Sequence, residues 1–453
     1  MVYNKHDWQD NELITAQALN NIELGILNSK NISVSVKEYG AVGDGLTDDT
    51  QAINTALSNN VGGSVYLEPN KTYLISDTIN ITGGTTFDGN MSTIFLNTDV
   101  DYAISASVSG AKLCNFWLKK NKDTPASGIY IYGSANILDN IHSRNQIWNT
   151  FIHAVDLKES HFSHIRVDND TTNKTGIILN YEHCINNTLT TSFFGYCDTG
   201  ILIPDIAAST GHYTEGLMIS DTSIVMSNTA IDIEHGTAIN VSNSILDFCQ
   251  NYGVKLYAGQ MFTMSNTWVA VVNDNATIIS IANSSDDRFN EYLITNNMFV
   301  GGTTNTGQKA FNIPGNSKRV VASGNILQSI PAGTIFAKNA YLEGNLTSIN
   351  SPITGYQKIK TSTFYPTNTA SGLPLNSAFE LVAQQMGTNN ILSVFGNISS
   401  SGVMSTTNIT SKNISVGTYS SANKTLSVVP ADGVSSNMMI VLKIYPTDHL
   451  TTQ

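Results

Sequence analysis

One repeated pattern along residues 110–347 restricts the folds open to this chain. A line made of an apolar residue, a polar residue and most often an asparagine returns every 22 to 30 residues. A second apolar strand, headed by a small residue, lies between these lines, as at 128–131, 200–203 and 253–256. Two registers that advance together by about 24 residues indicate one supersecondary unit per coil, with each coil stacked on the next. The pattern therefore predicts a β-solenoid of about ten coils over residues 35–350. The lines begin at Leu113, Leu138, Phe162, Leu189, Ile219, Val241, Met264, Ile294 and Ala322.

The composition agrees with a coil of short strands and tight corners. Only 13% of the residues are charged, and the chain has 51 asparagines and 34 glycines. Residues of these types favour turns over long helices. We expect the small residues to mark one corner of each coil and the asparagines to form a ladder of amide hydrogen bonds at another.

Residues 35–58 form a separate block with its own loop and helix signals. Three glycines follow Tyr39, and Asp48 or Asp49 is placed to cap a helix that carries Ile53. A phosphate-binding loop is excluded, because no Lys-Ser/Thr follows and two aspartates occupy the place of the anion. The block resembles the first segment of pectate-lyase-like right-handed β-helix proteins, in which a helix covers the open end of the coil. The resemblance implies a right-handed parallel β-helix, but not one activity, since the family includes lyases, hydrolases, epimerases and non-enzymatic spikes.

The N-terminal segment, residues 1–34, carries the best helical pattern, at residues 11–28. Its apolar residues recur at three-to-four spacing and form one stripe that needs a partner. The helix either caps the domain behind it or forms a short parallel bundle between identical chains. The segment from Trp8 to Ile26 is similar to the start of tail and baseplate proteins from phages of Gram-positive bacteria. That resemblance implies attachment to phage baseplate or tail proteins, a location in the virion and a homotrimer. The stripe consists of Ile14, Ala18, Leu19, Ile22 and Ile26.

The coil rhythm stops near Ser351, and residues 351–453 read as short strands broken by Ser, Asn and Gly turns. Regular spacing of such strands predicts a C-terminal β-sandwich. Its role is either trimerisation or glycan binding. The fold class predicted for the whole chain is all-β: a right-handed parallel β-helix with a short N-terminal helix and this sandwich.

Outward-facing side chains of the second strand are predicted to stack into columns, because strand side chains alternate. Aromatic rings beside carboxylates suit sugar binding, since rings cover C–H patches and carboxylates accept from hydroxyl groups. A solvated face and a face buried between subunits are the alternatives. The candidate substrate-binding residues are Tyr130, Tyr132, Asp156, Lys255 and Tyr257. The first column is expected to contain Tyr130, Asp156, Ile178, Leu202, Asp232, Lys255, Ile279 and Asn312.

Four carboxylates are the candidate catalytic residues. Asp232 and Glu234 are two apart on one strand and share a face, so they can supply an acid beside an ionised base. We expect Lys255, one coil above, to lower the pKa of Asp232, which leaves Glu234 as the proton donor. Glu215 lies at the foot of an insertion over 204–216, and Asp247 lies at a corner of the following coil. A solvated ion pair is the alternative for the strand pair.

Several classes of function are excluded or disfavoured. With 35 acidic and 23 basic side chains, the chain has a formal charge of −12, which excludes a nucleic-acid binder with a basic surface. The sequence contains no run of 18 apolar residues, so we expect no membrane span. Its first residues include no apolar segment of the kind found in signal peptides, so we expect no signal peptide. The four cysteines are expected to be buried thiols, and we expect no metal and no cofactor. A calcium-dependent lyase needs an aspartate cluster and a catalytic arginine, whereas the arginines Arg144, Arg166, Arg288 and Arg319 are scattered.

These patterns and resemblances lead to one functional hypothesis with two alternatives. The hypothesis is a phage tail spike that binds and hydrolyses a bacterial surface glycan, either a polysaccharide or a wall teichoic acid. The alternatives are a non-catalytic receptor-binding adhesin and a structural baseplate spike.

Overall fold

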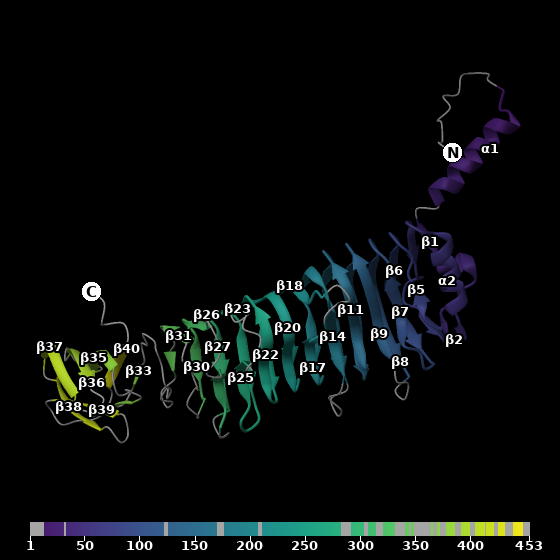
Figure 1. Ribbon diagram of the computed structural model, residues 1–453. Helices are drawn as coiled ribbons and strands as arrows, with labels where there is room; N and C mark the ends of the chain where they lie inside the picture. The colour runs from purple at the N-terminus through teal and green to yellow at the C-terminus, as the bar shows by residue number, and fades with distance from the viewer. Residues whose placement is uncertain are drawn as a thin grey trace. The chain divides into compact units, whose positions relative to one another are not determined.

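The structure is a computed structural model of the 453-residue chain. It describes residues 13–30, 33–121, 126–169, 176–206, 211–281, 291–302, 307–313 and 320–330, and beyond residue 340 the strands named below. The fold is an all-β parallel solenoid of about ten turns with few helices, as the repeat predicts (Figure 1). Contacts within the chain divide it into two compact units, Met1–Asp170 and Thr171–Gln453.

Unit 1 contains three parallel sheets in its coils. The first sheet consists of β1 (Ser33–Ser35), β3 (Ser64–Tyr66), the first parts of β6 (Thr86–Leu96), β8 (Lys112–Lys120) and β10 (Ile137–Gln146), and β12 (His161–Ser163). The second sheet consists of β2 (Asp44–Asp48), β4 (Thr72–Ile75), the later parts of β6, β8 and β10, and β13 (Arg166–Asn169). The third consists of β5 (Ile79–Asn80), β7 (Tyr102–Ser107), β9 (Ser127–Ser134) and β11 (Thr150–Lys158).

Unit 2 also builds its coils from three parallel sheets, here called sheets A, B and C. Sheet A contains β14 (Ile177–Glu182), β17 (Thr199–Ile203), the first part of β20 (Thr229–Ser242), β22 (Tyr252–Gln260), β25 (Thr277–Ile281) and β28 (Lys309–Asn312). Sheet B contains β15 (Ile185–Thr190), β18 (Thr214–Ser220), the later part of β20, β23 (Phe262–Ser265), β26 (Tyr292–Thr295), β29 (Val320–Ser323) and β31 (Ala340–Glu343). Sheet C contains β16 (Phe193–Gly195), β19 (Ser223–Val225), β21 (Ile245–Cys249), β24 (Trp268–Val271), β27 (Met298–Val300), β30 (Ile326–Gln328) and β32 (Leu346–Thr347).

The third residue of every repeat line lies at a corner with left-handed backbone. Asn, Asp and Gly adopt this conformation at the lowest cost, which explains the asparagines of the pattern. The expected amide ladder is present in part: Asn140 donates to the Asn115 Oδ1 atom at 2.8 Å, and Asn266 donates to that of Asn243 at 3.4 Å. The φ values are 59° at Asn115, 54° at Asn140, 52° at His164, 50° at Thr191, 51° at Asp221, 48° at Asn243, 49° at Asn266, 56° at Asn296 and 66° at Gly324.

The interior of each coil is filled by the inward aliphatic and aromatic side chains. Where a small residue heads a strand, the neighbouring coil approaches closely: a Cβ atom at Gly253 would lie 2.4 Å from Val269 Cγ1 and 2.7 Å from the Ile278 carbonyl oxygen. All four cysteines are free and buried, which confirms that prediction.

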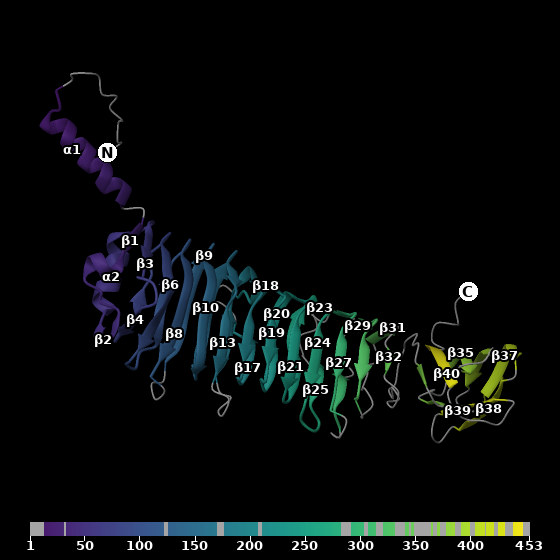
Figure 2. The same ribbon diagram turned by 180° about the vertical axis from the view of Figure 1, so that it is seen from behind.

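α2 (Thr50–Asn59) covers the end of the coils at the start of unit 1 (Figures 1 and 2). Its Ile53 and Leu57 side chains are fully buried. Asp49 holds the preceding loop, because its carboxylate accepts from the Val42 amide at 2.7 Å and the Gly43 amide at 3.0 Å. The aspartates of this motif are therefore structural acceptors, and the expected capping helix is present.

The ends of the chain contain the remaining elements. α1 spans Ala16–Lys30, and the Leu13, Ile14 and Leu19 side chains on the predicted apolar stripe or beside it are exposed. No helix in the described residues is long and apolar enough to cross a membrane. The C-terminal strands form two antiparallel sheets. One contains β33 (Phe364–Tyr365), β40 (Met438–Pro446), β35 (Ser377–Gln385), β36 (Ile391–Ile398) and β37 (Met404–Lys412), and the other β34 (Thr369–Ser371), β39 (Thr425–Pro430) and β38 (Ile414–Ser420).

Candidate functional site

The outer face of sheet A carries the candidate residues of unit 2. The strand register places Leu202, Asp232 and Lys255 on successive coils, as predicted. Two expected members of the column were wrong, because Ile178 and Ile279 are fully buried core residues. In the strands of these two residues, two or more consecutive side chains are buried. A strict inward–outward alternation, counted from the first apolar residue, therefore assigns Ile178 and Ile279 to the outer face although they lie in the core. The observed column is Asn180, Leu202, Asp232, Lys255, Ser280 and Asn312.

Asp232 and Lys255 form an ion pair across two coils. Lys255 Nζ donates to Asp232 Oδ2 at 2.8 Å. Asp232 is only 9% exposed, although it faces outward, and its Oδ1 atom is buried without a hydrogen-bond partner among the described residues. A buried carboxylate oxygen without a donor favours the protonated acid over the ion.

Burial determines the direction of the Asp232 pKa. Desolvation raises this pKa above its ordinary value, and the negative charges of Glu234 and Asp198 raise it further, while the hydrogen bond and charge of Lys255 lower it. The net shift is upward. Lys255 lowers the pKa of Asp232, as expected, but the net direction is the opposite of the expected one, because the cost of burying the charge exceeds the gain from the lysine. These surroundings therefore favour the protonated form of Asp232.

The insertion that follows β17 is fixed beside Glu234 by its two ends. The Asp205 amide donates to Glu234 Oε2 at 3.0 Å, and the Asp205 carboxylate lies 3.0 Å from His235 Nδ1. At the other end of the insertion, the Tyr213 ring stacks on the His235 ring, with centroids 3.5 Å apart and an interplanar angle of 11°. His235 is thus a structural hydrogen-bonding residue, and the insertion that it anchors orients Glu234. The register also places the exposed Tyr257 beside Glu234 on the next coil.

The structure does not bring the other two catalytic candidates to this pair. Glu215 lies on β18 in sheet B, where it pairs with Thr237, three residues after Glu234 on β20. Asp247 lies on β21 in sheet C and accepts from Trp268 Nε1 at 3.4 Å. Of the four candidates, only Asp232 and Glu234 share a face.

The predicted binding residues Tyr130, Tyr132 and Asp156 lie in unit 1. Tyr130 and Tyr132 point outward from β9, as expected. Asp156 does not follow Tyr130 in the column, because the register aligns Ile152 rather than Val155 with Ile129, and His153 therefore pairs with Tyr130. Sequence reasoning missed His153, although the alternation of Ile152, His153 and Ala154 would have identified it.

Two tyrosines and His153 form an aromatic group on this face of unit 1. The Tyr102 hydroxyl lies 2.6 Å from His153 Nδ1. The ring centroids of Tyr102 and Tyr130 are 5.2 Å apart, and the Tyr130 and His153 rings meet edge to face at 5.8 Å. The three residues are half-buried, and their accessible ring faces can cover the C–H face of a sugar ring.

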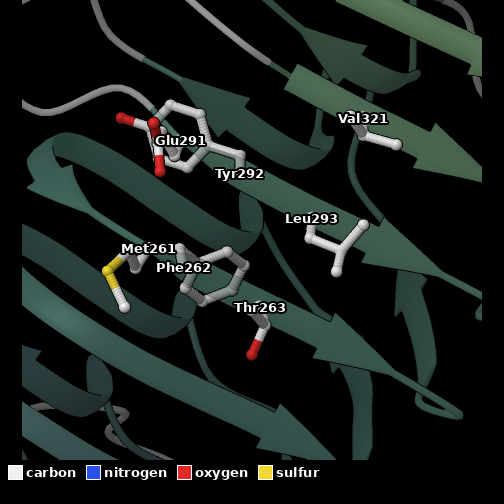
Figure 3. Close-up of a pocket in the computed structure, with 7 residues that line it drawn as sticks. All are labelled: Met261, Phe262, Thr263, Glu291, Tyr292, Leu293 and Val321. Carbon is white, nitrogen blue, oxygen red and sulfur yellow. The ribbon is translucent and has the colours of Figure 1, made fainter.

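A pocket of about 400 Å³ lies on sheet B, away from the Asp232 face (Figure 3). Its walls come from β23, β26 and β29 and are mostly apolar, with the Glu291 carboxylate at the start of β26. In the described part of the chain no cluster of three or more His, Cys, Asp or Glu side chains is arranged to hold a metal ion.

Residues 33–286 match the model of the family described as rhamnogalacturonase A/epimerase, pectate lyase-like. The chain belongs to this family. Its looped motif at Tyr39–Asp49, the capping helix and the stacked coils are the features that the family resemblance predicts.

Solved structures support the fold. A tailspike protein of Escherichia coli bacteriophage HK620, in complex with a hexasaccharide, superposes with a TM-score of 0.57 at 10% identity, over 93% of this chain and 94% of that one. The same tailspike with a pentasaccharide gives a TM-score of 0.53 at 8% identity, over the same shares of the two chains. The protein is thus a pectate-lyase-like right-handed β-helix whose fold is similar to that of this tailspike.

Two curated proteins match over short segments. A plasmin- and fibronectin-binding protein A of Streptococcus pneumoniae is 41% identical over 69 residues, which are 14% of this chain. A non-secreted LysM effector of Penicillium expansum is 43% identical over 58 residues, which are 12% of this chain. The matched segments span 10% and 4% of the lengths of these two relatives.

Proposed function

We propose that this protein is a phage tail spike that binds a bacterial surface glycan and hydrolyses it with Asp232 and Glu234. The observation that supports the proposal is the environment of Asp232. Its carboxyl group is buried on an outward-facing strand, has one oxygen without a partner and has Glu234 two residues away on the same face. A carboxyl group with a raised pKa beside a second carboxylate is the arrangement used in glycoside hydrolysis.

The chemistry assigns a role to each carboxyl group. Asp232 donates its proton to the glycosidic oxygen as the C–O bond breaks, and Glu234 accepts a proton from the water that forms the new C–O bond. Direct attack by water on the face opposite the leaving group gives inversion at the anomeric carbon.

Tyr257 and the aromatic group of unit 1 supply candidate sugar contacts. Tyr257 is exposed beside Glu234, and Tyr130 and Tyr132 face outward from β9. Lys255 holds the Asp232 carboxyl group in place, because its Nζ atom donates to Asp232 Oδ2. Asp156 lies at the bulge of β11 and has the weakest support among the binding candidates.

Residues 1–34 are proposed to attach the protein to baseplate or tail proteins of the virion, as part of a homotrimer. The exposed Leu13, Ile14 and Leu19 side chains support this role, because an apolar helix stripe is stable only against a partner. The C-terminal sheets, in residues 351–453, are proposed to clamp the trimer or to bind glycan. Analytical ultracentrifugation of the full chain and of residues 35–453 tests the assembly. A monomeric full chain contradicts it.

Release of reducing ends from bacterial surface glycans tests the catalytic proposal. We expect Asp232→Asn and Glu234→Gln each to lower kcat by about 100-fold or more, as for removal of a general acid or base. Glu215→Gln and Asp247→Asn are matched controls on sheets B and C and should keep activity within a factor of about 2. Loss of activity in the controls but not in the strand pair contradicts the assignment.

A further inference from the structure

We infer that the second sheet of unit 1 carries a binding site for a sugar ring that bears an anionic group, either a carboxylate or a phosphate ester. The site consists of Trp117, Lys119 and Arg144, on the outer faces of the neighbouring strands β8 and β10 (Figure 2). The inference goes beyond the proposed function, because neither Asp232 nor Glu234 takes part in this site.

The outer face of this sheet has a surplus of positive charge. Lys119 on β8, Arg144 on β10 and Arg166 on β13 all project from it. Asp168 is the one carboxylate on the same face of these three strands, which the structure describes in full. The chain as a whole has a formal charge of −12, so this face differs in sign from the rest of the molecule and attracts anions.

The Arg144 guanidinium is held in place and remains accessible. Asp168 Oδ2 lies 3.5 Å from Arg144 Nε and 3.4 Å from Arg166 Nη2, so one buried oxygen orients both guanidinium groups. The Asp168 side chain is 13% exposed, whereas that of Arg144 is 57% exposed. Because Nε is directed at Asp168, the Nη end of Arg144 is available to donate to a carboxylate or a phosphate, which a guanidinium binds in a bidentate manner.

Trp117 supplies an aromatic ring beside these cations, and its neighbours fix the orientation of that ring. The register pairs Trp117 with His142, and their ring centroids are 4.7 Å apart. The Asn140 amide nitrogen donates to Asn115, so its oxygen, 2.8 Å from His142 Nε2, accepts the proton of that nitrogen. Burial and the charge of Arg166 lower the pKa of His142. Trp117 therefore packs on an oriented and neutral imidazole ring.

The aromatic ring and the two cations are placed to bind one sugar residue together. Lys119 Nζ lies 6.0 Å from the centroid of the Trp117 ring. Arg144 is two residues after His142, as Lys119 is two residues after Trp117, so the register places Arg144 beside Lys119 at the usual strand spacing of about 4.8 Å. A sugar ring with its C–H face on the indole can thus direct an anionic substituent to Lys119 and Arg144.

The same groups could in principle receive a nucleic-acid base and its phosphate, because bases also stack on aromatic rings. A nucleic acid is a polyanion whose binding depends on many phosphate contacts, and the net charge of −12 opposes it. An anionic sugar needs the local cations alone, which favours the glycan.

Fluorescence anisotropy with the full-length wild-type protein tests the inference. The probes are a labelled glucuronate oligosaccharide, the same oligosaccharide after reduction of its carboxyl groups, and the reduced form with a phosphate ester at C6. We expect an anionic form to bind about tenfold more tightly than the reduced form at low salt, which corresponds to about 1.4 kcal/mol. NaCl at about 0.5 M should remove most of this difference, because it screens the attraction. Comparison of the carboxylate and phosphate forms identifies the anionic group.

Protein variants locate the binding. Lys119→Met and Arg144→Gln should each lower the affinity for the anionic form by about tenfold and leave that for the reduced form unchanged. Lys112→Met removes a lysine from the part of β8 that lies in the first sheet, so it is the matched control and should bind as wild type does. Trp117→Ala should weaken binding of the anionic and the reduced forms alike, whereas Trp117→Phe keeps an aromatic ring and should keep most of the affinity.

Three results overturn the inference. The first is no binding, or equal affinity for the anionic and reduced forms. The second is an equal loss of affinity in Lys112→Met and Lys119→Met. The third is tighter binding of a single-stranded oligonucleotide than of either anionic glycan. Each result leaves the proposed function in place, because the role of Asp232 and Glu234 is tested by product release and not by binding in unit 1.

Discussion

Replacement of Lys255 with methionine removes the ionic partner of Asp232 and keeps the length of the side chain. Asp232 then has no hydrogen-bond donor at either oxygen while it is 9% exposed. Loss of one partner of a fully buried pair costs about 3–5 kcal/mol. Because the lysine side chain is 36% exposed, solvent screens part of this interaction, and we expect a loss of about 1–2 kcal/mol near neutral pH.

The pH dependence distinguishes this cause from lost packing. Burial already raises the folded-state pKa of Asp232 above 3.8, so this group reduces stability as the pH rises from the unfolded value through the folded value. Without Lys255 the folded pKa rises further, and the decrease extends to higher pH. The variant should therefore be most destabilised near pH 8 and close to wild type near pH 3, below the ordinary value of 3.8, where the carboxyl group is mostly protonated in the folded and the unfolded state.

Hydrogen exchange of the β20 and β22 amides measures this loss locally, which suits a long solenoid that need not unfold in one step. Lys309→Met is the matched control on the same sheet and should have little effect. The double variant Asp232→Asn, Lys255→Met should recover most of the loss. An equal loss at pH 3 and pH 8, or no recovery in the double variant, refutes the reasoning.

Three further predictions concern the coil and the insertion. Thr191 is a β-branched residue at a corner with φ 50°, so Thr191→Asn should raise stability by about 1 kcal/mol in thermal melts, whereas Thr190→Asn should not. Gly253→Ala should destabilise by about 1–3 kcal/mol in urea titrations, because its Cβ atom would lie 2.4 Å from Val269 Cγ1; an unchanged midpoint contradicts the packing. Tyr213→Ala should speed hydrogen exchange of the Asp205 amide, while Tyr213→Phe keeps the ring stacked on His235 and should exchange as wild type does.

The repeat made the coil predictable, because each corner constrains both sequence and backbone. The third residue of each repeat line adopts left-handed φ, a conformation that asparagine tolerates better than most residues. An asparagine at that position therefore predicts a corner of the coil. The alternation of side chains also predicted correctly that Leu202, Asp232 and Lys255 lie in one column, because their strands pair in register without a bulge.

The rest of the site depended on features that local patterns do not encode. Asp156 was assigned to the column by aligning the small residue Ala154 with Gly128, whereas the strands pair Ala154 with Ile131. Glu215 and Asp247 are close to Asp232 and Glu234 in sequence, but they lie on strands of sheets B and C, respectively, rather than on sheet A. The pKa of Asp232 depends on burial among neighbouring coils, and the sequence showed only that a lysine was near.

The most direct test of the account compares wild-type protein with the double variant Asp232→Asn, Glu234→Gln on isolated bacterial surface glycans. Both proteins are measured for glycan binding and for the release of reducing ends. The account predicts product from the wild type, none from the variant, and binding by both. Product from both proteins would show an enzyme with its catalytic residues elsewhere, and binding without product from the wild type would show an adhesin; either result contradicts the claim that this strand pair cleaves the glycan.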